Sequence, residues 1–442
     1  MSDATRPRDS ALIANRRRFQ GLRAASPWLA VLAVAVLLPW LFYDYAHGRQ
    51  NSFMISMFSQ MGMMVIFALA FNMLMGEAGL MSFGHAAFFG FGGYCVAHFL
   101  NAAAEGDFPV PLELMPLAAG LSGLALAIVF GAMATKQRST AFAMITFGIG
   151  QLMVTAALMF QHFFGGESGV STDRQSAYSL LGINYAQGLE VYYLIVAWAL
   201  IAALGMHYLT GTPLGRMANA CRDNHERAQF MGYNPRMVRF LQFALSGFFA
   251  GVGGGLYAIT YEIVTYDAVN LPLSGNALLM AYIGGVGTFT GPVLGAVLIT
   301  AMQSGVSLMS NSWVIYVGVL FIIMVTFAPT GLTGIIKAHA PLARAGRLGR
   351  LVVPYLRLTS PGLMVVLGFV GLVEMLSFLT IGAAEGKRFN VLGLSPNLHA
   401  SPPWLITAAC LSIGAIWLRR EARLFHRVWD TLMADLGPAG NR

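Results

Sequence analysis

The chain carries the stretch GEAGLMSFGHAAFFGFGGY, from Gly76 to Tyr94, in which six glycines and one histidine stand among apolar residues. Glycine weakens a helix by about 1 kcal/mol relative to alanine. Small residues nevertheless recur here at helical spacing, at Ser82, Ala86, Gly90, Gly93 and Ala97. A stripe of small residues lets a neighbouring helix approach closely, which is how helices associate in lipid. The stretch therefore predicts a close-packed membrane helix, with Gly79, Ala86, Gly90 and Gly93 as packing positions.

The composition extends this reading to the whole chain. Of its 442 residues, 57% are hydrophobic and only 10% are charged, whereas soluble domains carry about 25% charged residues. Apolar runs near the length of about 20 residues that crosses a bilayer predict an all-α, polytopic transmembrane bundle. We expect spans at 28–43, 53–75, 82–100, 114–135, 140–160, 190–209, 240–260, 276–289, 291–310, 313–328, 361–381 and 403–418. The third and eighth of these, 82–100 and 276–289, either cross the membrane or re-enter it.

The basic residues predict the orientation. With the N-terminus in the cytoplasm, 23 of the 27 Lys and Arg residues fall in cytoplasmic segments, as the positive-inside rule requires. The exceptions are Arg49, Arg174, Lys387 and Arg388. The first span lacks a convincing signal-peptide cleavage site, so we expect it to be retained. These patterns predict a basic cytoplasmic tail (1–27) before the spans, and two last spans followed by a basic cytoplasmic tail at the other end.

The sequence argues against several classes of chemistry. It has no phosphate-binding loop motif and no zinc-protease or hydrolase motif, so we expect no enzyme activity, no metal and no cofactor of its own. Its three cysteines lack metal-binding spacing, and the net charge of +8 reflects cytoplasmic loops and not nucleic-acid binding. Ionisable residues within the spans are scarce, which disfavours a stand-alone ion-coupled carrier or channel but leaves it as an alternative.

The loop 211–239 is the longest strongly polar stretch within this apolar domain. Thr212-Pro213 predicts a helix start, and Gly232 followed by Asn234-Pro235 predicts its end. We expect one short amphipathic helix that either docks a cytoplasmic partner or serves as a solvated connector. Its candidate coupling residues are Arg216, Arg222, Asp223, Glu226, Ala228 and Gly232.

The segment MAYIGGVGTFTGPVLGAVLIT, Met280 to Thr300, predicts a broken helix. Broken helices at membrane depth offer backbone groups to a transported solute, although close packing also explains glycines. We therefore assign Gly284, Gly285 and Gly287, together with Ser82 and His85, to a candidate translocation path. For His85 the alternative is a polar residue hydrogen-bonded between packed helices.

Together these segments resemble the M-type permease subunits of branched-chain amino-acid ABC importers. The resemblance rests on GEAGLMSFGHAAFFGFGGY, on GRMANACRDNHERAQFMGYN with the following FALSGFFAGVGGGLYA, and on YIGGVGTFTGPVLGA with FAPTGL. It covers about residues 30–336, and the chain departs from the family after Leu332. The resemblance therefore implies a transmembrane domain (28–336) followed by a C-terminal extension (337–442) with two further spans and a basic cytoplasmic tail. Glu226-Arg227-Ala228-x-x-x-Gly232 is similar to the element that enters a groove on the ATPase, with Arg227 in place of the usual alanine.

The resemblance implies one of two paralogous permease subunits in a multi-pass assembly of the bacterial inner membrane, with both termini in the cytoplasm. Two separate ATPases would bind ATP, and a periplasmic binding protein would deliver the solute. The implied solute is a branched-chain or other hydrophobic amino acid. Closely similar permeases carry urea or short amides, which remains an alternative.

Overall fold

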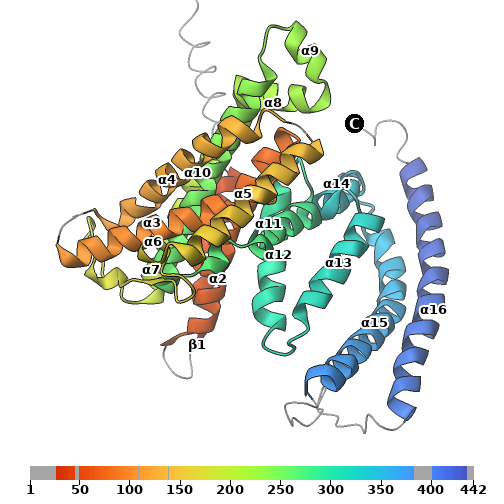
Figure 1. Ribbon diagram of the computed structural model, residues 1–442. Helices are drawn as coiled ribbons and strands as arrows, with labels where there is room; N and C mark the ends of the chain where they lie inside the picture. The colour runs from red at the N-terminus through yellow and green to blue at the C-terminus, as the bar shows by residue number, and fades with distance from the viewer. Residues whose placement is uncertain (1–25, 45–48, 107–109, 138, 383–400, 436–442) are drawn as a thin grey trace, which may run out of the picture. The chain divides into compact units, whose positions relative to one another are not determined.

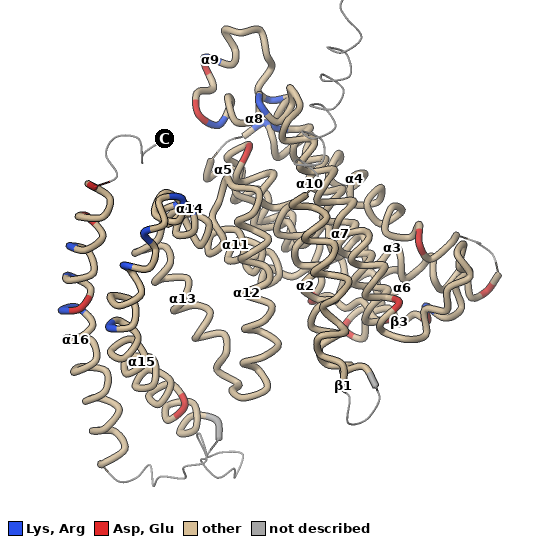
Figure 2. Tube along the Cα trace, turned by 180° about the vertical axis from the view of Figure 1, so that it is seen from behind, with Lys and Arg blue, Asp and Glu red and all other residues tan. Residues whose placement is uncertain are grey.

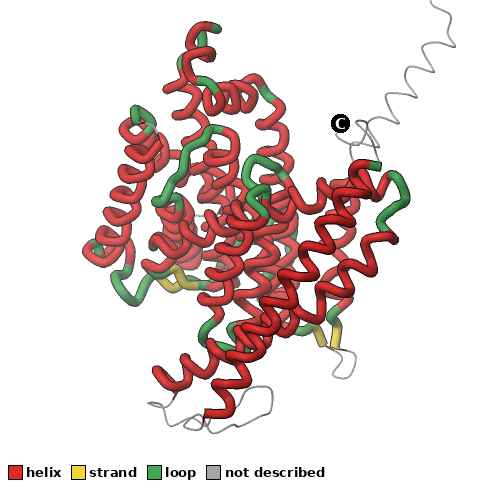
Figure 3. The backbone as a smooth tube through the Cα atoms, turned by 90° about the vertical axis from the view of Figure 1, so that its right-hand side faces the viewer, coloured by secondary structure: helices red, strands yellow, loops and turns green. Residues whose placement is uncertain are grey.

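The structure is a computed structural model that describes residues 26–44, 49–106, 110–137, 139–382 and 401–435. The expected basic tail 1–27 lies almost entirely outside these ranges, as do Lys387, Arg388 and the last residues of the C-terminal tail. The described chain is helical almost throughout, which confirms the all-α prediction (Figure 1; Figure 3).

The helices that follow the first one, Ser26–Leu41, alternate with short turns. Their bounds are α2 Ser52–Asn72, α3 Ala86–Glu105, α4 Met115–Ala134, α5 Ser139–Met159, α6 Gln161–Phe164, α7 Gly188–Gly211, α8 Pro213–Asp223, α9 His225–Phe230, α10 Pro235–Tyr261, α11 Leu271–Gly284, α12 Thr290–Val306, α13 Trp313–Phe327, α14 Gly331–Arg344, α15 Gly349–Ser377 and α16 Ser401–Ala434. Short 3₁₀ turns are η2 Leu112–Leu114, η3 Arg174–Ser176 and η4 Tyr266–Val269, and π-helical turns are η1 Met73–Glu77 and η5 Phe378–Gly382. Two antiparallel strand pairs complete the described fold: β1 Tyr43–Asp44 with β2 Arg49–Gln50, and β3 Val170–Ser171 with β4 Ile263–Val264.

Within the described ranges, seven helices are long and apolar enough to cross a membrane, or eight if the bent pair α13 and α14 forms one span. The sequence predicted twelve spans. Five predicted spans are not among the seven. They are α3, α13, which passes only together with α14, and the shorter apolar helices Ser26–Leu41, α11 and α12. At 1.5 Å per residue, the 14 residues of α11 reach only about two thirds of a 30 Å hydrocarbon core.

The chain forms two compact units, residues 1–301 and 302–442, whose boundary falls inside α12 and precedes the expected boundary at 336. In the first unit, α10 packs against α4, α3 and α2. Glycines let the backbone of α10 approach the backbones of α4 and α3. A Cβ on Gly251 would collide with the Ala119 carbonyl oxygen, and one on Gly254 would overlap the backbone of Phe89. These contacts explain why the GVGGG run tolerates membrane burial.

The second unit is built around the pairing of α15 with α16. Glycines again mark the contact, since a Cβ on Gly368 would lie 3.0 Å from Leu411, and one on Gly371 would lie 2.9 Å from Thr407. Where the two helices continue past their apolar halves, Leu342, Leu351 and Leu432 form a buried cluster with Phe425 and Trp429 packed on it. The predicted extension is thus a packed element with its own small core.

Candidate functional site at the 211–239 loop

The loop 211–239 contains two helices and not the single helix expected. α8 starts at Pro213 after an extended Thr212, and Asn224 adopts an extended conformation that separates α8 from α9. The Asn224 side chain accepts a hydrogen bond from the Arg227 amide at 2.9 Å, so it caps α9. The prediction of one continuous helix from Pro213 to Gly232 is therefore wrong, because an asparagine that hydrogen-bonds its own backbone competes with helix continuation.

The tip of this loop exposes apolar side chains. Phe230 is 90% exposed, and Met231 and Tyr233 beside it are about half exposed. Gly232 takes φ +84°, which is the left-handed conformation that glycine tolerates. Adjacent exposed apolar side chains on a polar loop are typical of protein contact sites. Phe230 is not among the coupling residues predicted from the charges, although a phenylalanine within a polar loop was a usable signal.

The predicted coupling residues divide into exposed and buried groups. Arg216, Arg222, Asp223 and Glu226 are exposed, and Figure 2 shows most of the described basic residues of the first unit gathered around α8, α9 and the start of α10. Ala228, a residue of α9, is fully buried.

Arg222 points back toward the membrane helices. Its guanidinium donates a hydrogen bond to the Gly76 carbonyl and a second one, at 3.0 Å, to Asp223. Its aliphatic stem passes over Gly79, where a Cβ would lie 2.7 Å from the Arg222 Cγ. Gly79 is in a turn with φ +69° and is therefore not a helix-packing position.

The segment around Gly76 that hydrogen-bonds Arg222 also contacts the glycine-rich break between α11 and α12. Asn72 accepts a hydrogen bond from the Gly287 amide at 3.0 Å and donates one to the Thr288 carbonyl at 3.3 Å. A Cβ on Gly76 would lie 2.8 Å from the Gly287 nitrogen. The three segments singled out in the sequence thus converge at one place, which we call the junction: Arg222, Gly76, Gly79, Asn72 and Gly287.

Two further features surround the junction. The π-helical turn η1 leads directly into it, and π turns within α-helices are frequent at functional sites. The Glu77 carboxylate beside it is buried and accepts a hydrogen bond at 2.7 Å from Thr210, near the end of α7. The ends of α2 and α7 are therefore tied together beside α8.

Among the remaining candidate path residues, Gly284 has a packing role. A Cβ on Gly284 would overlap the carbonyl of Gly291, so α11 and α12 meet backbone to backbone. Gly285 and Gly287 take positive φ of 122° and 78°, which opens the break between the two helices.

His85 and Ser82 lie inside the first unit, away from any described surface. His85 is fully buried, its ring contacts Phe67, Phe71 and Phe88, and its Nε2 lies 3.3 Å from the Ser246 hydroxyl. Ser82 is 1% exposed and precedes α3, so it is not on the predicted helical stripe. Gly90 and Gly93 do lie on it, facing η4 and α10. This environment favours the packing interpretation of His85.

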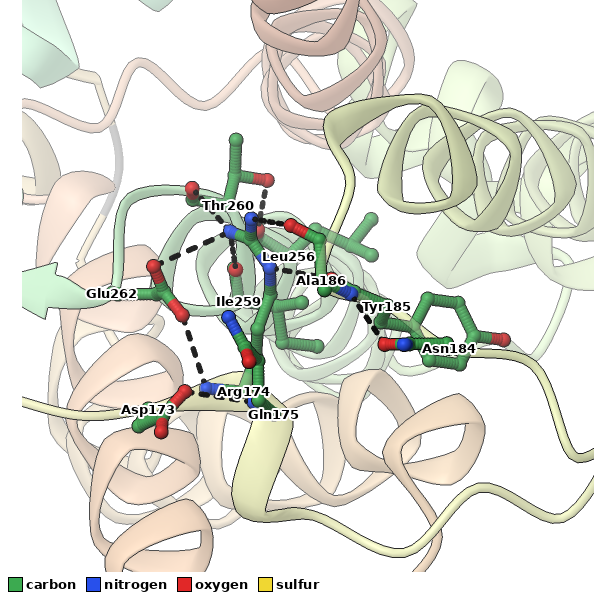
Figure 4. A network of polar contacts seen from close by, with 10 residues as sticks. All are labelled: Asp173, Arg174, Gln175, Asn184, Tyr185, Ala186, Leu256, Ile259, Thr260 and Glu262. Carbon is green, nitrogen blue, oxygen red and sulfur yellow. Dashed lines mark hydrogen bonds and ion pairs between the residues drawn. The ribbon is translucent and has the colours of Figure 1, made fainter.

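At the opposite end of the unit, Arg174 holds the 171–187 loop in place (Figure 4). Its guanidinium donates to the carbonyls of Tyr185 at 2.8 Å, Thr260 at 3.2 Å, and Ala186 and Ile259 at 3.3 Å each. It also forms an ion pair with Glu262 at 3.5 Å. Glu262 caps α10 with φ +55°. Arg174, an exception to the basic-residue pattern, therefore satisfies backbone acceptors at the end of α10.

Glu113 also hydrogen-bonds the 171–187 loop. Its carboxylate accepts hydrogen bonds from the Ser179 hydroxyl at 2.7 Å, the Leu180 amide at 3.1 Å and the Tyr185 hydroxyl at 3.2 Å. Burial, reinforced by the Glu113 charge, raises the pKa of Tyr185 to about 12. Tyr185 therefore stays protonated at neutral pH and remains a donor to Glu113.

Within the described ranges, no group of three or more His, Cys, Asp or Glu residues is placed to hold a metal ion.

Comparisons with known proteins identify the family of the chain. Residues 53–328 match the family described as branched-chain amino acid transport system / permease component. The permease protein LivM of the high-affinity branched-chain amino acid transport system of Escherichia coli is 23% identical over 64% of this chain and 71% of its own length. The permease protein BraD of the high-affinity branched-chain amino acid transport system of Pseudomonas aeruginosa is 22% identical over 61% of this chain and 91% of its own length.

Over a shorter stretch, the ribose import permease protein RbsC of Haemophilus influenzae is 26% identical over 32% of this chain and 45% of its own length. No solved structure matches this chain. Because the family match covers more than half of the chain and the apolar helices agree with it, this chain is a multi-pass inner-membrane protein that belongs to the branched-chain amino acid transport permease family.

Proposed function

We propose that this chain is one of two permease subunits of an ATP-driven importer for branched-chain or other hydrophobic amino acids. Separate ATPases would dock on the 211–239 loop in the cytoplasm, and a periplasmic binding protein would deliver solute to the opposite end, near the 171–187 loop. Both termini would then be cytoplasmic. The chain would contribute part of the translocation path and would bind no ATP itself.

The observation that carries the proposal is the junction. Arg222 leaves the exposed loop and hydrogen-bonds the backbone at Gly76, which is packed against Gly287 in the break between α11 and α12. A push on α8 would therefore reach the ends of α2 and α11 through one side chain. Two states that ATP and the loaded binding protein favour differently would provide alternating access.

The apolar loop tip supports the docking assignment. Phe230 contributes nothing to the core at 90% exposure, so a buried role in a partner groove accounts for it. Fully desolvated aromatic anchors dominate many protein interfaces.

Reconstitution tests the proposal directly. The chain is assembled with its partner permease, ATPases and binding protein in proteoliposomes, and ATP-dependent uptake of leucine and of urea is measured. We expect leucine uptake that needs every component. Uptake of urea alone would instead support the short-amide alternative, and uptake without the ATPases would support an ion-coupled carrier.

The Phe230→Ser variant tests the docking surface. Loss of one interface anchor costs about 2 kcal/mol or more, so we expect the ATPases to dissociate about thirtyfold more readily. The matched control is Met309→Ser, because Met309 is also 90% exposed but lies outside the loop. Equal ATPase retention in both variants would contradict the docking assignment.

A further inference from the structure

A cavity lies at the end of the first unit opposite the junction. Its volume is about 640 Å³, within the range of roughly 300–1,000 Å³ typical of small-molecule sites. Its walls come from the starts of α2 and α7, from Thr260 near the end of α10, and from Arg174. The same three helices, α2, α7 and α10, also contact η1 beside the junction.

One wall of the cavity is a row of hydroxyls. Ser52, Ser56 and Ser59 follow i, i+4 and i+7 along α2 and so lie on one helical face. Within the described part of the chain, none of these three hydroxyls has a hydrogen-bond partner. Gln50, next to the row, has a buried side-chain oxygen that is likewise without a partner among the described residues. Ser52 and Ser56 are exposed, whereas Ser59 is 2% exposed. Because buried polar atoms are normally satisfied, the buried Gln50 oxygen beside Ser59 indicates a bound polar partner.

The cavity offers no free ionic partner among its described lining residues. Arg174 is the one lining residue with a formal charge, and its guanidinium is committed to four carbonyls and Glu262. A ligand with a net charge would be poorly compensated here. A neutral or zwitterionic head that hydrogen-bonds to hydroxyls and amides fits the row.

Apolar side chains also line the cavity. Leu189 and Val191 belong to α7, and Ile55 lies on α2 beside the serine row. Ile55 and Val191 are nearly buried. A short aliphatic group would replace water against these side chains, which is favourable at about 25 cal/mol per Å² of apolar surface buried. The cavity thus combines hydrogen-bonding side chains with aliphatic ones.

We propose that this cavity is a solute-binding site for a small amphipathic molecule with a zwitterionic or neutral polar head and a short aliphatic side chain. The polar head binds Ser56, Ser59 and Gln50, and the aliphatic part contacts Ile55 and Val191. The assignment rests on the proposed function, which supplies the reason for a solute to reach this end. Because α2, α7 and α10 connect the cavity to the junction, an occupied cavity is also placed to bias the other end of these helices.

Solute protection of an introduced thiol tests the site. In the assembled transporter, Cys95, Cys221 and Cys410, all free thiols where described, are replaced by alanine and Ser59→Cys is introduced. A small membrane-impermeant methanethiosulfonate is the label, and L-leucine is the probe. We expect labelling to slow about tenfold when leucine is about ten times its half-protecting concentration, since protection follows occupancy.

Ser176→Cys is the matched control, because Ser176 is an exposed serine of the neighbouring loop that does not line the cavity. Its labelling is expected to be the same with and without leucine. An unreactive Ser59→Cys, or equal labelling rates with and without leucine, would overturn the site.

Uptake supplies a second measurement. Ser56→Ala combined with Ser59→Ala removes two hydrogen bonds, so leucine uptake at limiting concentration is expected to fall about tenfold. Basal ATP hydrolysis by the assembled complex should persist and report an intact assembly. Ser122→Ala, which removes a hydroxyl of α4 bonded to the Ala119 carbonyl, should transport normally. If wild-type uptake depends on ATP and the double variant takes up leucine equally well, the site is rejected but the proposed function stands.

Discussion

At the scale of single residues, Arg222 is the side chain whose position sequence reasoning could not give. Its acceptor, the Gly76 carbonyl, lies 146 positions away in the chain. The pattern of charges on α8 predicts that Arg222 faces a partner protein; the side chain is partly exposed, and its guanidinium also donates to the membrane domain at Gly76. The position of Arg222 also explains Gly79, which the spacing of small residues did not. A side chain at Gly79 would collide with the aliphatic stem of Arg222.

We predict that Arg222→Gln separates ATP hydrolysis from transport. A hydrogen bond from a charged donor contributes about 1.5–3 kcal/mol, so leucine uptake should fall about tenfold or more, while the ATPases stay bound through the loop tip. Uptake and ATP hydrolysis are measured together in proteoliposomes. Arg222→Lys should restore part of the uptake, because an ammonium group also donates to a carbonyl.

Arg236→Gln is the control for this prediction, since Arg236 is an exposed arginine at the start of α10. If both variants lowered uptake equally, general loss of positive charge would explain the effect and the junction would not.

His85 gives a prediction that separates packing from solute contact. Its ring is enclosed by Phe67, Phe71 and Phe88, so His85→Phe should keep uptake near the wild-type level. His85→Ala should lower the free energy of unfolding by about 3 kcal/mol, because it leaves a cavity where a ring stood. Apparent melting temperature and leucine uptake are measured for both variants. Normal melting of His85→Phe together with lost uptake would place His85 on the solute path.

At the scale of elements, the sequence predicted most helices of the first unit and their approximate positions. Apolar runs located α2, α4, α5, α7 and α10 within a few residues. It failed where a local side chain overrides periodicity, as at Asn224, whose cap divides the loop helix. It also failed for Arg174, because the carbonyls that bind this residue become neighbours only when the loop folds onto α10.

The contact between α11 and α12 supports a prediction with an internal control. Gly284→Ala places a Cβ on the Gly291 carbonyl, so the two helices must separate, which costs about 1–3 kcal/mol. Gly275→Ala in the same helix meets nothing within 4 Å and should raise stability by up to about 1 kcal/mol through helix propensity. The two apparent melting temperatures should move in opposite directions. Similar shifts in both would contradict the close contact.

At the scale of the whole molecule, the first unit holds both the junction and the cavity, and the second unit holds the extension. Residues matched to the family end at 328, before α15 begins. Within the second unit, α15 is attached through Glu374, which accepts hydrogen bonds from the Ser310 hydroxyl and, at 2.5 Å, from Tyr316. The extension is therefore anchored to the last helices that the family shares.

The last prediction concerns the helix pair α15 and α16. Removing residues 349–442 takes away α15 and α16 together, and uptake should remain close to that of the full chain, because the loop 211–239 and the cavity lie in the other unit. Removing only residues 401–442 should be worse, since it exposes the face of α15 at Gly368 and Gly371 that packs on Leu411 and Thr407. Membrane insertion and leucine uptake of both truncations are compared. If α15 and α16 were independent helices, the shorter deletion would lower uptake and insertion less. If they form a pair, the shorter deletion is the more damaging one, because it leaves the small-residue surface of α15 without its partner.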